Sequence, residues 1–168
     1  MVEDRRPVRF RELLQSLVEG NVEFIVVGGV AAVLEGVPVS TFDLDIVFSL
    51  DPTNIGRLEG VLNGLSAVYA DPAGRTIRPT VERLRGGGQH LLRTRFGRLD
   101  VMGTTGDGLA FQDLVSRSRT RTVHGLEILV LTLEALIATK ESANRPKDRA
   151  VLDLLRGTLA QREGDKGD

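Results

Sequence analysis

The chain has 168 residues, of which 41% are hydrophobic and 27% charged, and its formal net charge is −1. These values are ordinary for a globular protein and predict a single domain over residues 1–168. The absence of cysteine excludes disulfides and thiolate chemistry, and two histidines are too few for a His-rich zinc site. There is no signal-peptide core and no run of membrane-spanning length, so we expect a cytoplasmic protein that does not contact a membrane.

Charge is distributed unevenly along the chain. Residues 1–74 carry 11 acidic and 5 basic residues, whereas residues 75–124 carry 4 acidic and 10 basic residues. All ten basic residues of the middle segment are arginines, whose planar side chain suits phosphate. A solvated surface explains such a segment about as well as a polyanionic substrate does, so the charge alone leaves both interpretations open.

The first elements surround a pair of glycines. Helical spacing of apolar residues predicts an amphipathic helix over residues 7–19, which would pack on a sheet. The β-branched run Phe24–Val27 predicts a buried strand that ends at Gly28-Gly29, where the backbone can turn sharply. A short helix starting at Gly29 would then point free backbone N–H groups at an anion such as phosphate.

A second strand is predicted over residues 41–49, where residues alternate between two faces. Thr41, Asp43 and Asp45 share one face, which places the two carboxylates roughly 6.5 to 7 Å apart along the strand. Carboxylates this close repel each other, and a hard cation such as Mg²⁺ is their natural partner together with phosphate oxygens. An Asp-x-Asp pair alone can be a solvated strand face, but its position after a Gly-Gly turn favours a metal and phosphate site.

The remaining patterns complete an α/β (α+β) fold, with a small mixed β-sheet flanked by helices. In the first part of the chain they predict a helix over residues 51–65, a short strand at 68–70, a loop over 71–89 and a β-hairpin over 89–102. The last part is expected to contain a helix from Asp107 to about residue 117, strands at 119–123 and 126–130, a helix over 133–143 and a final helix over 147–160. The core is thus expected over residues 24–103, with C-terminal helices over 132–160.

The block from Phe24 to Ser49 resembles the nucleotidyltransferase superfamily that includes DNA polymerase beta and kanamycin nucleotidyltransferase. The family pattern is a Gly-Gly or Gly-Ser turn, an Asp-x-Asp strand and a third carboxylate on a later strand. The first two parts match the turn and the Asp-x-Asp strand described above, and Asp100, on the second strand of the hairpin, matches the third. The resemblance implies a nucleotidyltransferase that uses an NTP and two Mg²⁺ (or Mn²⁺) ions held by Asp43, Asp45 and Asp100.

The C-terminal segment 133–155 resembles the branch of this superfamily related to the toxins of abortive-infection toxin–antitoxin systems. Lys140 and Asp148 match two active-site positions of that branch, whereas Val39 and Ser40 depart from it where an arginine is common. The resemblance implies tRNA or a protein as the acceptor, with an aminoglycoside-like small molecule as the alternative, and a cognate antitoxin as a partner. A module of the same fold that binds a nucleotide or a partner without turnover is the competing interpretation.

The resemblance also assigns residues that would contact the nucleotide. They are Gly28, Gly29, Thr41, Lys140 and Asp148, and Arg93 or Arg95 would help to offset the charge of the triphosphate.

Overall fold

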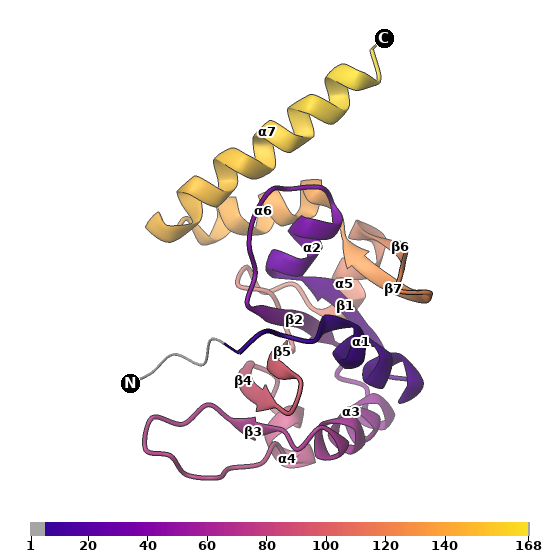
Figure 1. The fold of residues 1–168 in the computed structure, drawn as a ribbon, viewed down its shortest axis with the longest axis vertical. Helices are drawn as coiled ribbons and strands as arrows, with labels where there is room; N and C mark the ends of the chain where they lie inside the picture. Colours follow the sequence, from indigo (N-terminus) through magenta and orange to yellow (C-terminus); the bar gives the residue numbers. More distant parts are fainter. Residues whose placement is uncertain (1–5, 168) are drawn as a thin grey trace.

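The computed structural model describes residues 6–167, which form a seven-stranded mixed β-sheet with helices on both of its sides (Figure 1). The strand order is β3-β4-β5-β2-β1-β7-β6, in which β1 with β7 and β2 with β5 are parallel and the other neighbours are antiparallel. The predicted fold class is therefore confirmed. The strands are β1 Phe24–Val27, β2 Asp43–Phe48, β3 Val68–Tyr69, β4 Gln89–Thr94, β5 Gly97–Met102, β6 Ser118–Val123 and β7 Leu126–Leu131.

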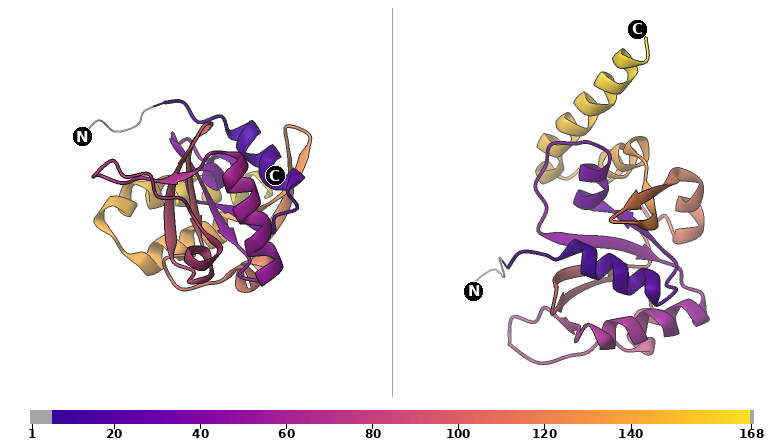
Figure 2. Two further views of the ribbon diagram at one scale, coloured as in Figure 1. Left: turned by 90° about the horizontal axis from the view of Figure 1, so that it is seen from below. Right: turned by 45° about the vertical axis from the view of Figure 1, so that its right-hand side comes forward.

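The helices lie in two groups. In Figures 1 and 2, α2 and α6 lie on one side of the sheet, and α1 and α3 lie on the other. The helices are α1 Phe10–Glu19, α2 Gly28–Leu34, α3 Pro52–Gly64, α4 Val81–Arg85, α5 Phe111–Leu114, α6 Leu133–Ala143 and α7 Arg149–Asp165, with short 3₁₀ turns at Val115–Arg117 and Pro146–Asp148. Among residues 6–167, no helix combines the length and the apolar character that a membrane span requires.

Two predicted helix starts are confirmed by their side-chain caps. Asp51 accepts hydrogen bonds from the backbone N–H groups of Thr53 and Asn54, and Thr132 accepts one from Ala135. Each cap satisfies backbone donors that have no partner within the helix. These two caps fix the starts of α3 and α6.

Three predicted boundaries were wrong. The first helix begins at Phe10 and not near Pro7, because the backbone N–H of Arg9 donates to the carbonyl of Phe96 and holds this segment extended along the hairpin turn. Helix α4 lies inside the predicted loop 71–89, and the last helix continues to Asp165. The contact with Phe96 thus determines where α1 begins, and the cap by Thr80 determines where α4 begins, although the local sequence pattern predicted otherwise.

The predicted helix from Asp107 was also wrong. The carboxylate of Asp107 accepts a hydrogen bond from the hydroxyl of Thr105, which closes a turn. Helix α5 begins only at Phe111, where the side chain of Asp113 accepts from the N–H of Ala110. Asp107 therefore closes a turn ahead of α5 and does not cap it.

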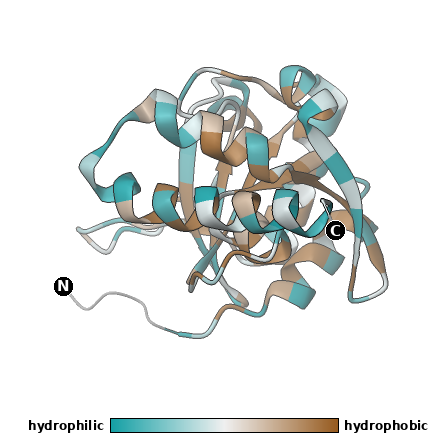
Figure 3. Cartoon of the chain, turned by 90° about the horizontal axis from the view of Figure 1, so that it is seen from above, coloured by the Kyte–Doolittle hydropathy of each residue, from teal (hydrophilic) through white to brown (hydrophobic). Residues whose placement is uncertain are grey.

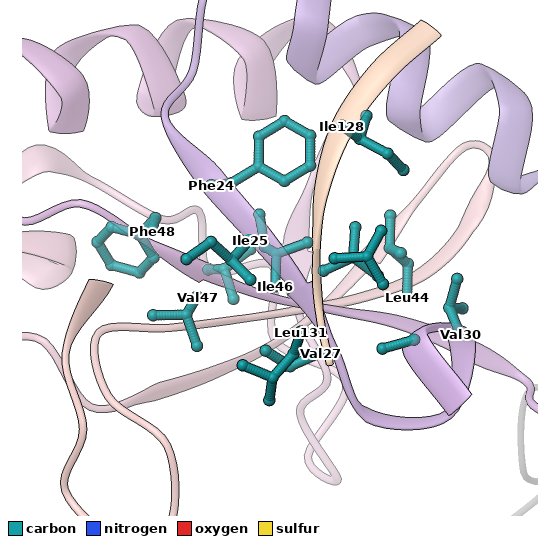
Figure 4. Close-up of a cluster of buried hydrophobic side chains, with 14 of the residues drawn as sticks. Phe24, Ile25, Val27, Val30, Leu44, Ile46, Val47, Phe48, Ile128 and Leu131 are labelled. Atoms are coloured by element: carbon teal, nitrogen blue, oxygen red, sulfur yellow. The ribbon is translucent and has the colours of Figure 1, made fainter. Parts of the chain in front are cut away.

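The core follows the central strands. Ile25, Ile46 and Phe48 are fully buried, and Figure 4 shows them among the buried side chains on the two faces of β1 and β2. Figure 3 shows hydrophobic residues concentrated in the central strands, with hydrophilic residues along the loops. Phe42 does not follow the alternation of buried and exposed residues predicted for the strand 41–49. It is 68% exposed, because it precedes β2, which begins at Asp43. The buried central strands thus fix the positions of the polar side chains that project from them.

Candidate functional site

Three aspartates converge where β2 and β5 run side by side. Asp45 is in register with Asp100 across the parallel pair, and Asp43 lies two residues before Asp45. Because strand side chains alternate, all three project from the same face of the sheet. One carboxylate oxygen from each lies within 4.8 Å of the other two, so the group could hold a metal ion.

Burial changes the protonation of this group. Asp100 is only 5% exposed, and its Oδ1 atom has no hydrogen-bond partner among the described residues. Burial, together with the neighbouring Asp43 and Asp45, raises the pKa of Asp100 to about 8, and burial with the charge of Asp43 raises the pKa of Asp45 to about 6. Buried, mutually repelling carboxylates with a free oxygen atom suit a divalent cation, which favours their charged form.

Gly28 shapes the turn beside this group. It has a φ of +65°, a conformation that other residues rarely adopt, and it packs directly on the carboxylate of Asp45. Gly29 packs instead on Thr41, whose hydroxyl donates to the backbone carbonyl of Asp43. Gly28 therefore reaches the aspartates directly, whereas Gly29 and Thr41 secure the backbone behind them.

A cavity of about 490 Å³ opens over the aspartates. The three carboxylates and Gly28 form one wall, and Lys140 of α6 lines another. Arg145 and Lys147, which follow α6, also line the cavity, and neither was predicted. The sequence signal for them was a pair of basic residues around Pro146, which we interpreted only as a break between helices.

Asp148 does not line the cavity, but it holds two residues that do. Its buried carboxylate accepts a hydrogen bond from Lys140 Nζ at 3.1 Å and one from Arg145 Nε at 2.8 Å. These bonds fix the direction of both cations. The cavity thus has a cluster of carboxylates on one side and an oriented group of cations on another.

The two hairpin arginines that were expected to contact the triphosphate, Arg93 and Arg95, lie elsewhere. Arg93 projects from the same face as the aspartates, because it pairs with Arg98 of β5, which is in register with Asp43. Arg95 lies in the hairpin turn, with its guanidinium 5.0 Å from the centre of the Phe96 ring. Neither lines the cavity.

One buried histidine near the cavity was missed by sequence reasoning. His90 of β4 contacts the Tyr69 hydroxyl through Nδ1 at 2.7 Å and the carbonyl of Gly87 through Nε2 at 2.6 Å. The adjacent residues Gly88 and Gln89 line the cavity. His90 thereby holds the glycine turn that forms this edge of the cavity, and a single histidine two residues after a run of three glycines gave no pattern that could predict this.

No protein-family model and no curated protein sequence matches the chain. Among solved structures, a candidate nucleotidyltransferase from Thermotoga maritima has a TM-score of 0.57 and 19% identity, over 95% of this chain and 99% of its own. The antibiotic-resistance factor ANT(2'')-Ia has a TM-score of 0.58 and 15% identity, over 94% of this chain and 84% of its own. The lincosamide antibiotic adenylyltransferase LnuA, bound to lincomycin, has a TM-score of 0.58 and 14% identity, over 89% of this chain and 95% of its own. The chain thus has the nucleotidyltransferase fold.

Proposed function

We propose that the protein is a metal-dependent nucleotidyltransferase, which transfers a nucleoside monophosphate from an NTP to an acceptor hydroxyl. The observation that carries this proposal is the convergence of Asp43, Asp45 and Asp100 within 4.8 Å at a cavity that Lys140 and Arg145 also line. The three carboxylates would hold Mg²⁺ or Mn²⁺, which stabilises the charge that develops on the reacting phosphate oxygens. The unpartnered Oδ1 of Asp100 supports this role, since a ligand atom needs no hydrogen bond of its own.

The reaction follows from this arrangement. The acceptor oxygen forms a bond to the α-phosphorus while the bond from that phosphorus to the β-phosphate oxygen breaks, and pyrophosphate leaves. The acceptor proton passes to a nearby base, for which the carboxylate of Asp100 is the candidate because it lies at the cavity beside the other two aspartates.

The cations beside the cavity would bind the triphosphate. Lys140, Arg145 and Lys147 line it and carry the charge and the donors that phosphate oxygens require. Asp148 acts on the nucleotide indirectly, by orienting two of these cations. We infer ATP as the donor, since LnuA is named an adenylyltransferase and a structure of ANT(2'')-Ia is in complex with adenylyl-2''-tobramycin.

The proposed function has two versions, which differ in the acceptor of the nucleotide. The resemblance of residues 133–155 to toxin-related nucleotidyltransferases favours tRNA or a protein, and with it a cytoplasmic toxin–antitoxin component that a cognate antitoxin controls. The structural likeness to ANT(2'')-Ia and LnuA supports the alternative, a small antibiotic-like acceptor. Both versions need the same metal and nucleotide site.

Label transfer tests the proposed function. The purified protein is incubated with each of the four α-³²P-labelled NTPs, Mg²⁺, total tRNA and cell protein, and the products are separated on a gel. Label in RNA or protein should vanish in the Asp43→Asn, Asp45→Asn double variant and persist in Asp153→Asn, which removes an exposed carboxylate of α7. Transfer by the double variant at the rate of the unmodified chain would refute the proposal.

A metal titration distinguishes the nucleotidyltransferase from a non-catalytic module that only binds a nucleotide or a partner. A catalytic site should bind Mg²⁺–ATP more tightly than ATP alone, because the cation screens the triphosphate from the aspartates. A module that only binds nucleotide or a partner should bind ATP equally with and without Mg²⁺. Calorimetry with Mg²⁺, and with EDTA, measures the difference directly.

A further inference from the structure

The sheet face that carries the aspartates continues past them onto the β4–β5 hairpin. Asp100 of β5 is directly opposite Leu91 of β4, and Arg98 is directly opposite Arg93. Residues directly opposite each other in an antiparallel pair project from the same face. The strands therefore present Leu91, Arg93 and Arg98 beside the aspartates, away from the part of the cavity lined by α6.

The Arg93–Arg98 pair is unusual because two like charges face each other across the strands. Such a pair destabilises a sheet unless another charge offsets it. Within residues 6–167, no carboxylate forms an ion pair with Arg93 or Arg98, whereas Arg75, Arg121, Arg145, Arg156 and Arg162 each have one. Asp43 is in register with Arg98 but makes no ion pair with it. Neither arginine thus has an ion-pair partner among residues 6–167, and the charge of Arg98 acts on Asp45 only at longer range.

The position of the arginine pair relative to the aspartates indicates which of the two substrates, the nucleotide or the acceptor, the pair contacts. Neighbouring strands are about 4.8 Å apart, so Arg98 lies one strand from Asp43, and Arg93 lies two strands away, at about 10 Å. The cations that line the cavity, Lys140 and Arg145, belong to α6 and the segment after it. The nucleotide therefore has its own cations, and the arginine pair lies on the side left for the acceptor.

We propose that Arg93 and Arg98 bind a phosphate group of the acceptor that neighbours its reacting hydroxyl. This inference rests on the proposed function and names the acceptor class: a hydroxyl compound with a phosphate ester, as in the 3′ end of an RNA or in a sugar phosphate. Leu91 supports it, because this side chain is 40% exposed beside Asp100 and provides an apolar surface for a sugar or base. Two guanidinium groups would repel a cationic acceptor such as an aminoglycoside.

The surrounding charge agrees with this assignment. Seven arginines occur between residues 75 and 98, in the loop, helix α4 and the hairpin, against one acidic residue, Glu82. Of these seven, only Arg75 pairs with a carboxylate of residues 6–167, that of Asp71. A region of this charge attracts an extended polyanion and steers it toward the aspartates.

Direct binding tests the inference without requiring turnover. The probes are a fluorescein-labelled six-nucleotide RNA with a free 3′ hydroxyl, followed by anisotropy, and ribose 5-phosphate, followed by calorimetry, both in EDTA without NTP. The variant is Arg93→Gln with Arg98→Gln. The matched control is Arg95→Gln, which removes an arginine of the same hairpin that lies over Phe96.

We expect the double variant to bind at least one probe about tenfold or more weakly, while Arg95→Gln binds it within twofold of the unmodified chain. For the RNA, the slope of log K against log salt should become shallower by about 0.7 for each phosphate that the arginines no longer neutralise. Weaker binding confined to the RNA identifies a polynucleotide acceptor, and weaker binding of ribose 5-phosphate as well identifies the phosphate ester alone. Equal binding by the double variant, or binding of neither probe, would overturn the inference.

A parallel titration with Mg²⁺–ATP keeps the two proposals apart. The Arg93, Arg98 double variant should bind Mg²⁺–ATP as the unmodified chain does, because the nucleotide is held by other cations. If Mg²⁺–ATP does not bind but the double variant binds the probes more weakly, the proposed function is refuted and the anion site at Arg93 and Arg98 is supported. If Mg²⁺–ATP binds and the double variant binds the probes with unchanged affinity, only the acceptor assignment is refuted.

Discussion

Gly28 and Asp45 fit together so closely that no side chain can stand between them. A Cβ atom on residue 28 would lie 3.0 Å from Cγ of Asp45 and closer still to its Oδ2. The φ of +65° at Gly28 places the backbone in this position. The turn after β1 therefore sets where the Asp45 carboxylate can lie, and with it the shape of the metal site.

The variant Gly28→Ala should separate this contact from backbone strain. We expect it to lose about 1–2 kcal/mol of stability from its positive φ and to bind Mg²⁺ at least about tenfold more weakly, because Asp45 must move. Gly36→Ala is the control, since Gly36 has a φ of +90° but no atom within 4 Å of its Cβ position. It should lose similar stability and keep its Mg²⁺ affinity, as measured by calorimetry and urea unfolding. Equal Mg²⁺ affinity in both variants would contradict the steric role of Gly28.

The raised pKa values of Asp45 and Asp100 predict how stability changes with pH. The folded protein holds these protons more tightly than the unfolded chain, whose aspartates titrate near pH 4. In metal-free buffer, the free energy of unfolding should therefore fall as the pH rises from about 4 through about 6 and 8, the pKa values of Asp45 and Asp100. Added Mg²⁺ should restore more stability at pH 8.5 than at pH 5, because it binds the ionised carboxylates.

The variant Asp100→Asn assigns this effect to one residue. Each pKa unit corresponds to about 1.4 kcal/mol, so without metal we expect the variant to be more stable than the unmodified chain by at least about 2 kcal/mol at pH 9. At pH 4 the two should differ by less than about 0.5 kcal/mol, because Asp100 is protonated in the folded protein and in about half of the unfolded molecules. Urea unfolding at the two pH values measures the difference, and the same gain at both would show that titration is not its source.

Asp148 should affect the nucleotide without touching it. The variant Asp148→Ala releases Lys140 and Arg145, so we expect kcat/KM for the NTP to fall about tenfold or more, chiefly through KM. Stability should fall by about 1–2 kcal/mol, because both partner side chains remain accessible to water. Asp153→Ala, on the exposed side of α7, is the control for removal of a carboxylate near the same helix start. A folded Asp148→Ala protein with unchanged KM would show that Lys140 and Arg145 do not need Asp148 to bind the nucleotide.

Glu35 should control acid stability. Its carboxylate is fully buried, and although burial opposes ionisation, hydrogen bonds from Arg162 and Arg121 hold its pKa below the usual value. The stabilisation is therefore present above the unfolded pKa and is lost as the pH falls through the lower, folded value. Glu35→Gln should cost about 3 kcal/mol at pH 7, because it leaves three arginines, Arg119, Arg121 and Arg162, without a partner charge.

This cost should shrink at pH 3, because below the ordinary glutamate pKa the unfolded chain takes up a proton at Glu35, which reduces the stabilisation that its charge provides. The control is Glu127→Gln, which removes an exposed carboxylate and should change stability by less than about 0.5 kcal/mol at either pH. Chemical unfolding at both pH values gives the comparison. A cost for Glu35→Gln that is the same at pH 3 and pH 7 would exclude the ionised carboxylate as its cause.

Local patterns predicted the parts of this fold that local chemistry determines. The β-branched run at Phe24–Val27, the cap at Asp51 and the cap at Thr132 each mark an element that the structure confirms. The alternation after residue 41 predicted that Asp43 and Asp45 share a face. Asp100 could be placed beside them only through the family resemblance, because strand order depends on contacts distant in sequence.

The remaining features depend on such distant contacts. Arg145 and Lys147 line the cavity because the chain turns at Asn144, the left-handed residue that ends α6, and Asp148 then holds Arg145, and no spacing in the sequence records these contacts. The facing arginines Arg93 and Arg98 became meaningful only once the hairpin register was known. Helix α4 was hidden because Pro79 and a run of three glycines flank five residues that a single threonine caps.

The contact between Glu35 and Arg162 also bears on the order in which the chain is made. The two residues are 127 positions apart, so a ribosome synthesises the acid long before the last of the arginines that offset it. Until then Glu35 can pair only with Arg119 and Arg121 of β6, which leaves its other carboxylate oxygen without a partner. The sheet can therefore assemble early, but the ion pairs of Glu35 are complete only when α7 emerges and docks. The final helix thus completes the fold as well as extending it.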